Sequence, residues 1–183
     1  QLDRITKNKK IVFFVGMDAN GLGFNPNAPL WDRYVSNLFK SSSDAAYFLK
    51  EICDKNDWTF IYKAHPNTKF SIADAERAFF ELDIDTLIHK ADVVVSFKSK
   101  SDYKALINGK PLVQIGYSML TNKECGYQVE KKEDIEKKIN EALKYGFTKK
   151  QKSNFVKHVT QLLKVHLWDD SIDRPLRYGQ IDI

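Results

Sequence analysis

The chain has 183 residues, which at about 150 residues per domain favours one domain of ordinary size. Hydrophobic residues make up 43% and charged residues 29%, a balance that excludes a disordered chain and suits a packed core. No apolar run approaches the roughly 20 residues that a membrane helix needs. We expect no signal peptide, because the first apolar run covers only residues 11–15. Two cysteines, Cys53 and Cys125, are too few for a disulfide framework and favour a cytoplasmic protein.

The net charge of +5 is unevenly distributed along the chain. Residues 131–167 contain ten Lys and four acidic residues, so their excess of +6 leaves the rest of the chain at −1. A basic surface can attract nucleic acid, an anionic membrane or an anionic small molecule, but on terminal helices it is more often simply solvated. These helices lack a nucleic-acid recognition signature, so nucleic acid is not expected as a partner.

The first third of the chain alternates apolar and polar segments. Residues 10–15 contain a continuous apolar run over 11–15, which is ended by Gly16 and predicts a strand buried on both faces. Residues 17–40 are polar and contain Gly, Pro and Asn, so we expect a long loop, a kind that is uncommon unless it is functional or mobile. A helix is predicted to open at Ser41, and residues 58–62 predict the second strand.

The alternation continues to the end of the chain. In order, the patterns predict helices at 73–81 and 84–90, a strand at 91–97, a helix at 101–108, strands at 112–115 and 127–129, and helices along 135–143 and 155–163. Strands separated by helices form βαβ units. We therefore predict a single Rossmann-like α/β domain over residues 1–167, with a mostly parallel sheet and helices on both faces, and a tail at 168–183.

In such sheets, ligands bind outside the carboxyl ends of the strands. Four predicted strands end in segments that are polar or contain glycine, and the topology should bring these segments to one edge. They are residues 16–23, 63–67, 96–101 and 116–120.

The glycines Gly16, Gly21 and Gly116 stand in two of these segments. Glycine lets the backbone approach a ligand closely, although it also simply forms turns. No Gly-Lys-Ser/Thr follows the first segment, so it is not a Walker A loop, and its spacing is not that of a dinucleotide site. ATP and NAD are therefore disfavoured.

The second segment reads Lys-Ala-His-Pro from Lys63 to Pro66. Pro66 keeps His65 out of helical geometry, so that its ring N–H can donate to a phosphate or carboxylate. Lys63 adds a positive charge two residues earlier. An isolated exposed histidine is often inert, but the position at a strand end favours a ligand role.

The third segment carries Ser96, Ser99 and Ser101 together with Lys98 and Lys100. Hydroxyls and backbone N–H groups at a helix N-terminus can bind an anion, and the same serines can cap the helix. No metal-ligand motif and no Ser-His-Asp array occurs at a recognisable spacing, so we expect no metal and assign no catalytic residue.

Three motifs in this order resemble the C-terminal, donor-binding half of a GT-B glycosyltransferase, most closely the bacterial capsule polysaccharide synthesis group with its Kdo-transferase-like proteins. They are Lys-x-His-Pro at 63–66, Ala-Asp-Val-Val-Val-Ser at 91–96 with the Ser-rich turn after it, and Lys-Ala-Leu-Ile-Asn-Gly-Lys-Pro-Leu-Val at 104–113. The resemblance covers about residues 11–163.

The resemblance implies a nucleotide-activated sugar as substrate and no separate cofactor. It implies that His65 contacts the nucleotide or its phosphate, and that Ser96, Ser99 and Ser101 hold the phosphate. Relatives with these motifs often use CMP-activated acidic sugars, such as Kdo or sialic acid, or CDP-activated alditols. A departing nucleotide carries negative charge, which His, Ser and Lys groups can stabilise.

The resemblance also implies partners. In GT-B enzymes the acceptor site lies on the N-terminal half, and position 1 here is Gln rather than Met, so we expect a fragment of a longer glycosyltransferase. Its partner would be the missing N-terminal acceptor domain, without which it would bind the donor but not transfer the sugar. The expected location is the cytoplasm, where peripheral contact with the inner membrane is compatible with surface polysaccharide synthesis.

Two other functions stay open. A non-catalytic α/β interaction or regulatory domain is favoured by Lys104, which stands where the family carries a Glu, and by the reduced glycine stretch after Gly116. A GT-B-fold sugar-nucleotide epimerase would act on a UDP-sugar rather than on a cytidine nucleotide.

Overall fold

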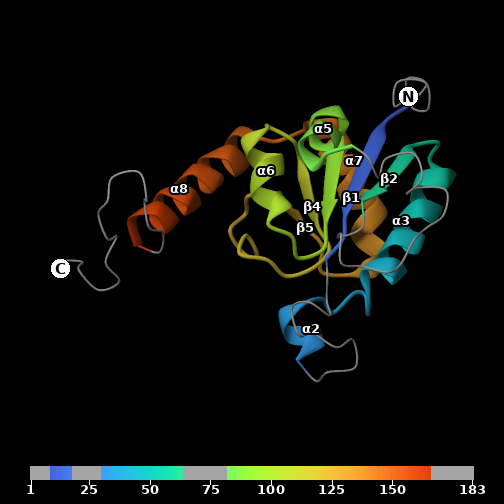
Figure 1. Ribbon diagram of the computed structural model, residues 1–183, viewed down its shortest axis with the longest axis horizontal. Coiled ribbons are helices and arrows are strands. Elements are labelled where there is room, and N and C mark those ends of the chain that lie inside the picture. Colours follow the sequence, from blue (N-terminus) through green and yellow to red (C-terminus); the bar gives the residue numbers. More distant parts are fainter. Residues whose placement is uncertain (1–8, 18–29, 64–81, 166–183) are drawn as a thin grey trace.

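A computed structural model describes residues 9–17, 30–63 and 82–165. Within them, five strands form one sheet of order β2-β1-β3-β4-β5, and every neighbouring pair is parallel (Figure 1). The strands are β1 (Ile11–Val15), β2 (Thr59–Lys63), β3 (Val93–Ser96), β4 (Leu112–Gln114) and β5 (Tyr127–Gln128). This order, reversing direction beside the first strand, is that of a Rossmann-like α/β domain and confirms the predicted fold class.

Four of the described helices, α3, α5, α6 and α7, follow the predicted patterns, and α8 contains the helix predicted along 155–163. They are α2 (Trp31–Tyr34), α3 (Ser42–Lys55), α5 (Ile84–Lys90), α6 (Ser101–Ile107), a 3-10 turn (Lys132–Asp134), α7 (Ile135–Tyr145) and α8 (Lys149–Val165). The α3 helix begins as expected, because the Ser41 hydroxyl accepts a hydrogen bond from the Asp44 N–H at 3.0 Å. The predicted helix at 73–81 and the predicted tail at 168–183 lie outside the described residues.

The sheet separates two hydrophobic layers, one on each face. Alternation along β1 sends Val12 and Phe14 to one face and Phe13 to the other, because successive side chains of a strand point in opposite directions. The first face packs against α3 and α7, and the second packs against α5, α6 and α8. Helices therefore cover both faces, which explains why β1 is apolar throughout.

The prediction of one long loop over residues 17–40 is wrong for its second part. Residues 31–34 form α2, and Trp31, Val35 and Phe39 are buried in the core at intervals of four residues. The Trp31 indole N–H donates to the Phe39 carbonyl at 2.8 Å. The Tyr117 N–H donates to the Val35 carbonyl at 2.7 Å, which joins this segment to the chain leaving β4. The three buried apolar side chains thus fix the structure of this segment, although the residues around them are polar.

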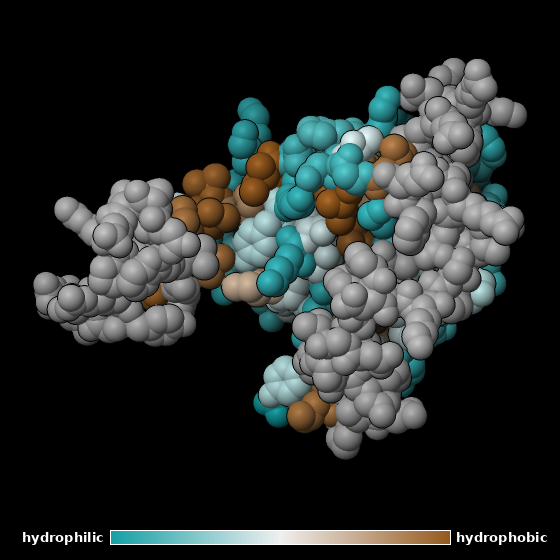
Figure 2. Space-filling model, in the orientation of Figure 1, coloured by the Kyte–Doolittle hydropathy of each residue, from teal (hydrophilic) through white to brown (hydrophobic). Residues whose placement is uncertain are grey.

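Helix α8 extends away from the sheet, and hydrophobic side chains gather over it in the space-filling view (Figure 1, Figure 2). Val156, Leu163 and Val165 are the large apolar residues of this helix that are exposed. Its other face is anchored, because Phe155 and His158 are buried. Within the described residues, every helix is either too short or too polar to cross a bilayer.

Both cysteines are buried thiols. Cys53 lies on the core face of α3. Burial raises the pKa of Cys53 to about 12, because a thiolate is poorly solvated among apolar side chains. This thiol is therefore a core residue and not a nucleophile.

Candidate functional site

The strand register brings to one edge of the sheet the strand ends that precede the predicted segments. Val15 at the end of β1 pairs with Lys63 on one side and with Ser96 on the other, and Ser96 pairs with Gln114. The carboxyl ends of four parallel strands therefore lie in one row, where ligands bind in this class of sheet.

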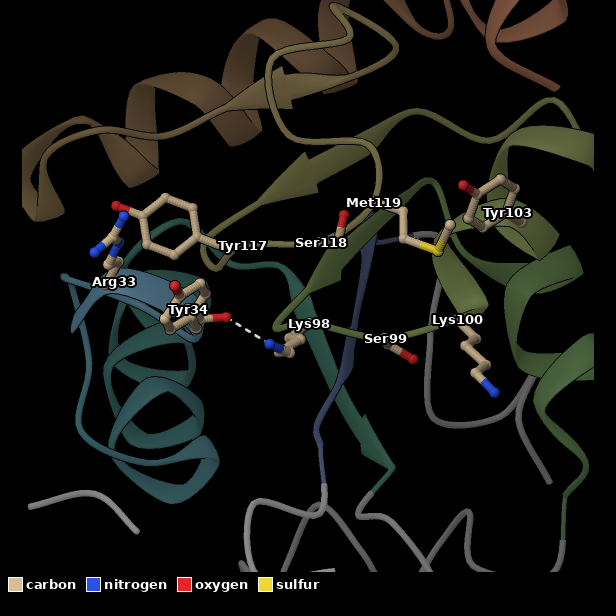
Figure 3. Close-up of a pocket in the computed structure, with 9 residues that line it drawn as sticks. All are labelled: Arg33, Tyr34, Lys98, Ser99, Lys100, Tyr103, Tyr117, Ser118 and Met119. Atoms are coloured by element: carbon tan, nitrogen blue, oxygen red, sulfur yellow. Dashed lines mark hydrogen bonds between the residues drawn. The ribbon is translucent and has the colours of Figure 1, made fainter. Parts of the chain in front are cut away.

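A cavity of about 500 Å³ opens beyond the ends of β3 and β4. Its size lies within the range of small-molecule sites. Two segments that follow strands form its centre, while α2 and α6 supply its sides (Figure 3). We name it the aromatic pocket; it is lined by Arg33, Tyr34, Lys98, Ser99, Lys100, Tyr103, Tyr117, Ser118 and Met119.

Tyrosine rings and cationic side chains both line this pocket. The Arg33 guanidinium lies over the Tyr34 ring, 5.4 Å from its centroid, and is held by a cation–π contact. The Lys98 ammonium donates to the Tyr34 carbonyl at 2.5 Å, and partial burial lowers its pKa. Lys98 also adopts a φ of 53°, a left-handed conformation that costs a residue with a Cβ about 1–2 kcal/mol. Such strain is concentrated at functional sites.

The three predicted serines have different surroundings. Ser99 lines the aromatic pocket, and its hydroxyl accepts a hydrogen bond from the Ser101 N–H at 3.1 Å. Ser101 is the first residue of α6. Ser96 is buried, and its hydroxyl donates to the Asp102 carboxylate rather than opening to the pocket. Of the three hydroxyls, the structure therefore brings only that of Ser99 to the cavity.

The glycines that the sequence singled out have packing reasons. A Cβ at Gly116 would lie 2.9 Å from the Val35 carbonyl oxygen, so only glycine lets the chain after β4 dock on α2. A Cβ at Gly16 would lie 2.9 Å from the buried Tyr62 hydroxyl oxygen. Gly116 consequently shapes one side of the aromatic pocket without lining it.

The second predicted segment is only partly described. Lys63 lies at the end of β2, and its ammonium donates to the Leu82 carbonyl at 2.8 Å. Gly21, His65 and Pro66 lie outside the described residues. The role of His65 beside the serines stays a prediction.

A buried carboxyl group lies behind the pocket wall. Asp102, in the first turn of α6, is 1% exposed. Burial raises the pKa of this carboxyl group to about 6, against the opposing effect of the Ser96 and Ser118 hydroxyls. Nearby, the Tyr103 hydroxyl lies 2.8 Å from Nε2 of His158, which joins the pocket to α8.

Sequence reasoning missed part of the lining. Tyr117 and Ser118 fall within a predicted segment, but Arg33 and Tyr34 lie in the stretch interpreted as loop, and Tyr103 lies in a helix. The apolar spacing from Trp31 onward was the signal that could have indicated α2.

A second cavity of about 510 Å³ lies between the β4–β5 edge and the start of α8. Amides and acidic groups dominate its lining. We name it the amide pocket; it is lined by Gln114, Asn122, Glu124, Gly126, Gln128, Glu130, Thr148, Lys150 and Gln151. Among the described residues, no three His, Cys, Asp or Glu side chains gather as a metal site would require.

Comparison with known proteins finds only a distant structural similarity. No family model and no curated protein matches the chain. Among solved structures, KpsC of Thermosulfurimonas dismutans, described as a beta Kdo 2,7 transferase, is similar with a TM-score of 0.48 and 20% identity. The alignment covers 68% of this chain and 40% of that chain, so this chain matches less than half of KpsC. At this level the similarity assigns neither a family nor an activity.

Proposed function

We propose that the aromatic pocket binds the nucleotide of an activated sugar, and that the chain is the donor-binding half of a glycosyltransferase in capsule or surface polysaccharide synthesis. CMP- or CDP-activated sugars are the proposed donors. The motifs at 63–66, 91–96 and 104–113 support this proposal, and so does the position of the pocket at the carboxyl edge of the sheet.

The observation that carries the proposal is the composition of the pocket lining. Three tyrosines, Tyr34, Tyr103 and Tyr117, surround the same cavity as three cationic side chains. A nucleotide needs both kinds of group, because its base stacks on aromatic rings and its phosphates pair with cations. Base–aromatic stacking is worth about 1–3 kcal/mol per base.

Roles follow from the chemistry of each group. Arg33 and Lys100 have long cationic side chains suited to phosphate oxygens, and the Ser99 hydroxyl can donate to the same oxygens. These groups would also stabilise the negative charge of a departing nucleotide. His65 and Lys63 would approach from the end of β2, as the sequence predicts.

Titration calorimetry with CMP, CDP, UDP and GDP tests the proposal. We expect saturable binding of CMP or CDP, weaker binding of the other two, and reduced affinity in a His65→Ala variant. Glu130→Gln, on the rim of the amide pocket, is the matched control that should bind like the wild type. Failure of all four nucleotides to bind would refute the proposal.

We propose the missing N-terminal acceptor domain as the partner for transfer, at the cytoplasmic side of the inner membrane. The chain alone should bind the donor without transferring its sugar. A donor-hydrolysis or transfer assay on the chain should therefore stay at background where calorimetry detects binding. Transfer by the chain alone would contradict this division of labour.

A non-catalytic interaction domain is the second candidate. The Lys104 ammonium pairs with Asp85 at 2.7 Å, so this position joins α6 to α5. The exposed apolar side chains of α8 also offer a contact surface. This candidate predicts no nucleotide binding, whereas a sugar-nucleotide epimerase would prefer UDP. The same titration distinguishes all three functions.

A further inference from the structure

The buried carboxyl group of Asp102 is only half satisfied by hydrogen bonds. Oδ1 accepts a hydrogen bond from the Ser96 hydroxyl, while Oδ2 has no hydrogen-bond partner of normal geometry. A buried polar oxygen without a partner is uncommon, because it loses its hydration without compensation. Besides Ser96, the Ser118 hydroxyl also lowers the pKa of this carboxyl group.

Ser118 lines the aromatic pocket and has one hydrogen-bonding option left. Its Oγ atom accepts hydrogen bonds from the Gln114 amide at 2.9 Å and from the Leu120 N–H at 3.1 Å. A hydroxyl oxygen has two lone pairs and one proton, so both lone pairs are occupied. Only the proton remains, and it can be donated inward to Asp102 or outward to an anion in the pocket.

We propose that Asp102 is a positioning residue whose protonation state decides whether the Ser118 hydroxyl is available to an anion in the aromatic pocket. Ionised Asp102 attracts the Ser118 proton and places a negative charge behind the wall. Neutral Asp102 releases that proton toward the pocket and removes the repulsion. Anion binding is then accompanied by proton uptake at Asp102. The O–H and N–H groups that contact the anion are already in place. That the anion is the phosphate of a nucleotide rests on the proposed function.

Both states of Asp102 occur near neutral pH, because its pKa is raised to about 6. The other charged groups at this wall are Lys98 and Lys100 after β3, with Arg33 on α2 across the cavity. On the side of α8, His158 touches Tyr103, and its pKa is lowered by burial and by Lys123. These groups are common to the wild type and to Asp102 variants, so a comparison between the two isolates Asp102.

The first experiment measures sulfate binding to the whole chain by NMR at Ser118 and Tyr117, from pH 7.5 to about pH 5.5. Sulfate keeps its charge over this range, unlike a nucleoside monophosphate. We expect the wild-type affinity to rise at least about threefold toward low pH, and Asp102→Asn to bind with a flat profile. A wild-type profile without pH dependence, equal pH dependence in both proteins, or no sulfate effect at Ser118 would overturn the inference.

A second measurement does not depend on any ligand. Carbon NMR titration of the Asp102 carboxyl group should show a higher pKa in Ser118→Ala, because the hydroxyl that lowers it is gone. Ser99 lines the same pocket, and Ser99→Ala should leave the pKa of Asp102 unchanged. An unchanged pKa in Ser118→Ala would refute the link.

The two proposals fail in different ways. If sulfate follows the expected profile and no nucleotide binds, then the proposed function is wrong and the role of Asp102 stands. If CDP binds with the same affinity and pH profile in wild type and in Asp102→Asn, then the role of Asp102 is wrong and the proposed function stands.

Discussion

The two cavities of this domain have nearly the same volume, about 500 and 510 Å³, and opposite chemistry. The aromatic pocket has three cationic side chains, and no carboxylate is among the described residues that line it. The amide pocket carries Glu124, Glu130 and a single Lys150, whose ammonium pairs with Glu124 at 2.7 Å. The size of a cavity therefore says little about its ligand here, whereas the charged side chains on its wall say more.

The pockets also share a wall. Gln114 lines the amide pocket, while its side-chain amide donates to Ser118 of the aromatic pocket at 2.9 Å. The two pockets are therefore neighbours in one domain. Matched variants in the two pockets can separate effects on stability, which both should show, from effects on binding, which only one should show.

The largest expected difference concerns Asp102. Its pKa is about 6 in the folded chain and 3.8 ordinarily, so the folded state binds this proton more tightly than the unfolded state. The resulting stability is fully present below pH 3.8 and is lost as the pH rises through 6. Relative to Asp102→Asn, the wild type should lose about 3 kcal/mol of unfolding free energy between pH 3 and pH 7. Urea denaturation across this range measures it, and parallel curves would contradict it.

Next come two glycines, one beside each pocket. A Cβ at Gly116 would lie 2.9 Å from the Val35 carbonyl oxygen, and a Cβ at Gly126 would lie 2.7 Å from that of Leu112. Gly116→Ala and Gly126→Ala should each cost about 1–3 kcal/mol, because backbone must move. Only Gly116→Ala should also weaken nucleotide binding. Urea denaturation and calorimetry test the pair, and equal effects on binding would remove the distinction between the pockets.

A smaller effect is expected from the cations themselves. Arg33→Gln and Lys100→Gln should each lower nucleotide affinity about threefold to tenfold, with less difference at high salt. Lys150→Gln removes a cation of the amide pocket and should leave the affinity unchanged. Calorimetry at two salt concentrations checks this. An equal loss in all three variants would indicate a general charge effect.

The smallest effect concerns the contact between the aromatic pocket and α8. Tyr103→Phe keeps the ring and removes the hydroxyl that lies 2.8 Å from His158 Nε2. We expect a loss of about 1 kcal/mol in unfolding free energy and a change in nucleotide affinity smaller than that of Lys100→Gln. Thermal denaturation measures the loss of stability, and calorimetry measures the change in nucleotide affinity. A larger loss of affinity than of stability would mean that the hydroxyl itself binds the ligand.

Local patterns were sufficient for most elements. The helix predicted at 84–90 coincides with α5 (Ile84–Lys90), and the helix predicted along 135–143 is α7 (Ile135–Tyr145). Gly146 ends this helix with a φ of 64°, a backbone conformation that glycine adopts without the steric cost of a Cβ atom. The helix repeat of about 3.6 residues and the strand repeat of about 2 residues relate residues that are close in the chain, so the sequence carries both directly.

The amino-acid sequence by itself determined the alternation of strands and helices, the burial of β1 on both faces, and the row of polar segments at strand ends. Only the tertiary structure decided which side chains enter the cavity. Ser96 turns inward to Asp102, while Arg33 and Tyr34 arrive from a distant segment held by Trp31 and the Val35 carbonyl. The physical reason is that a pocket is made by contacts between residues far apart in the chain, and no local periodicity records them.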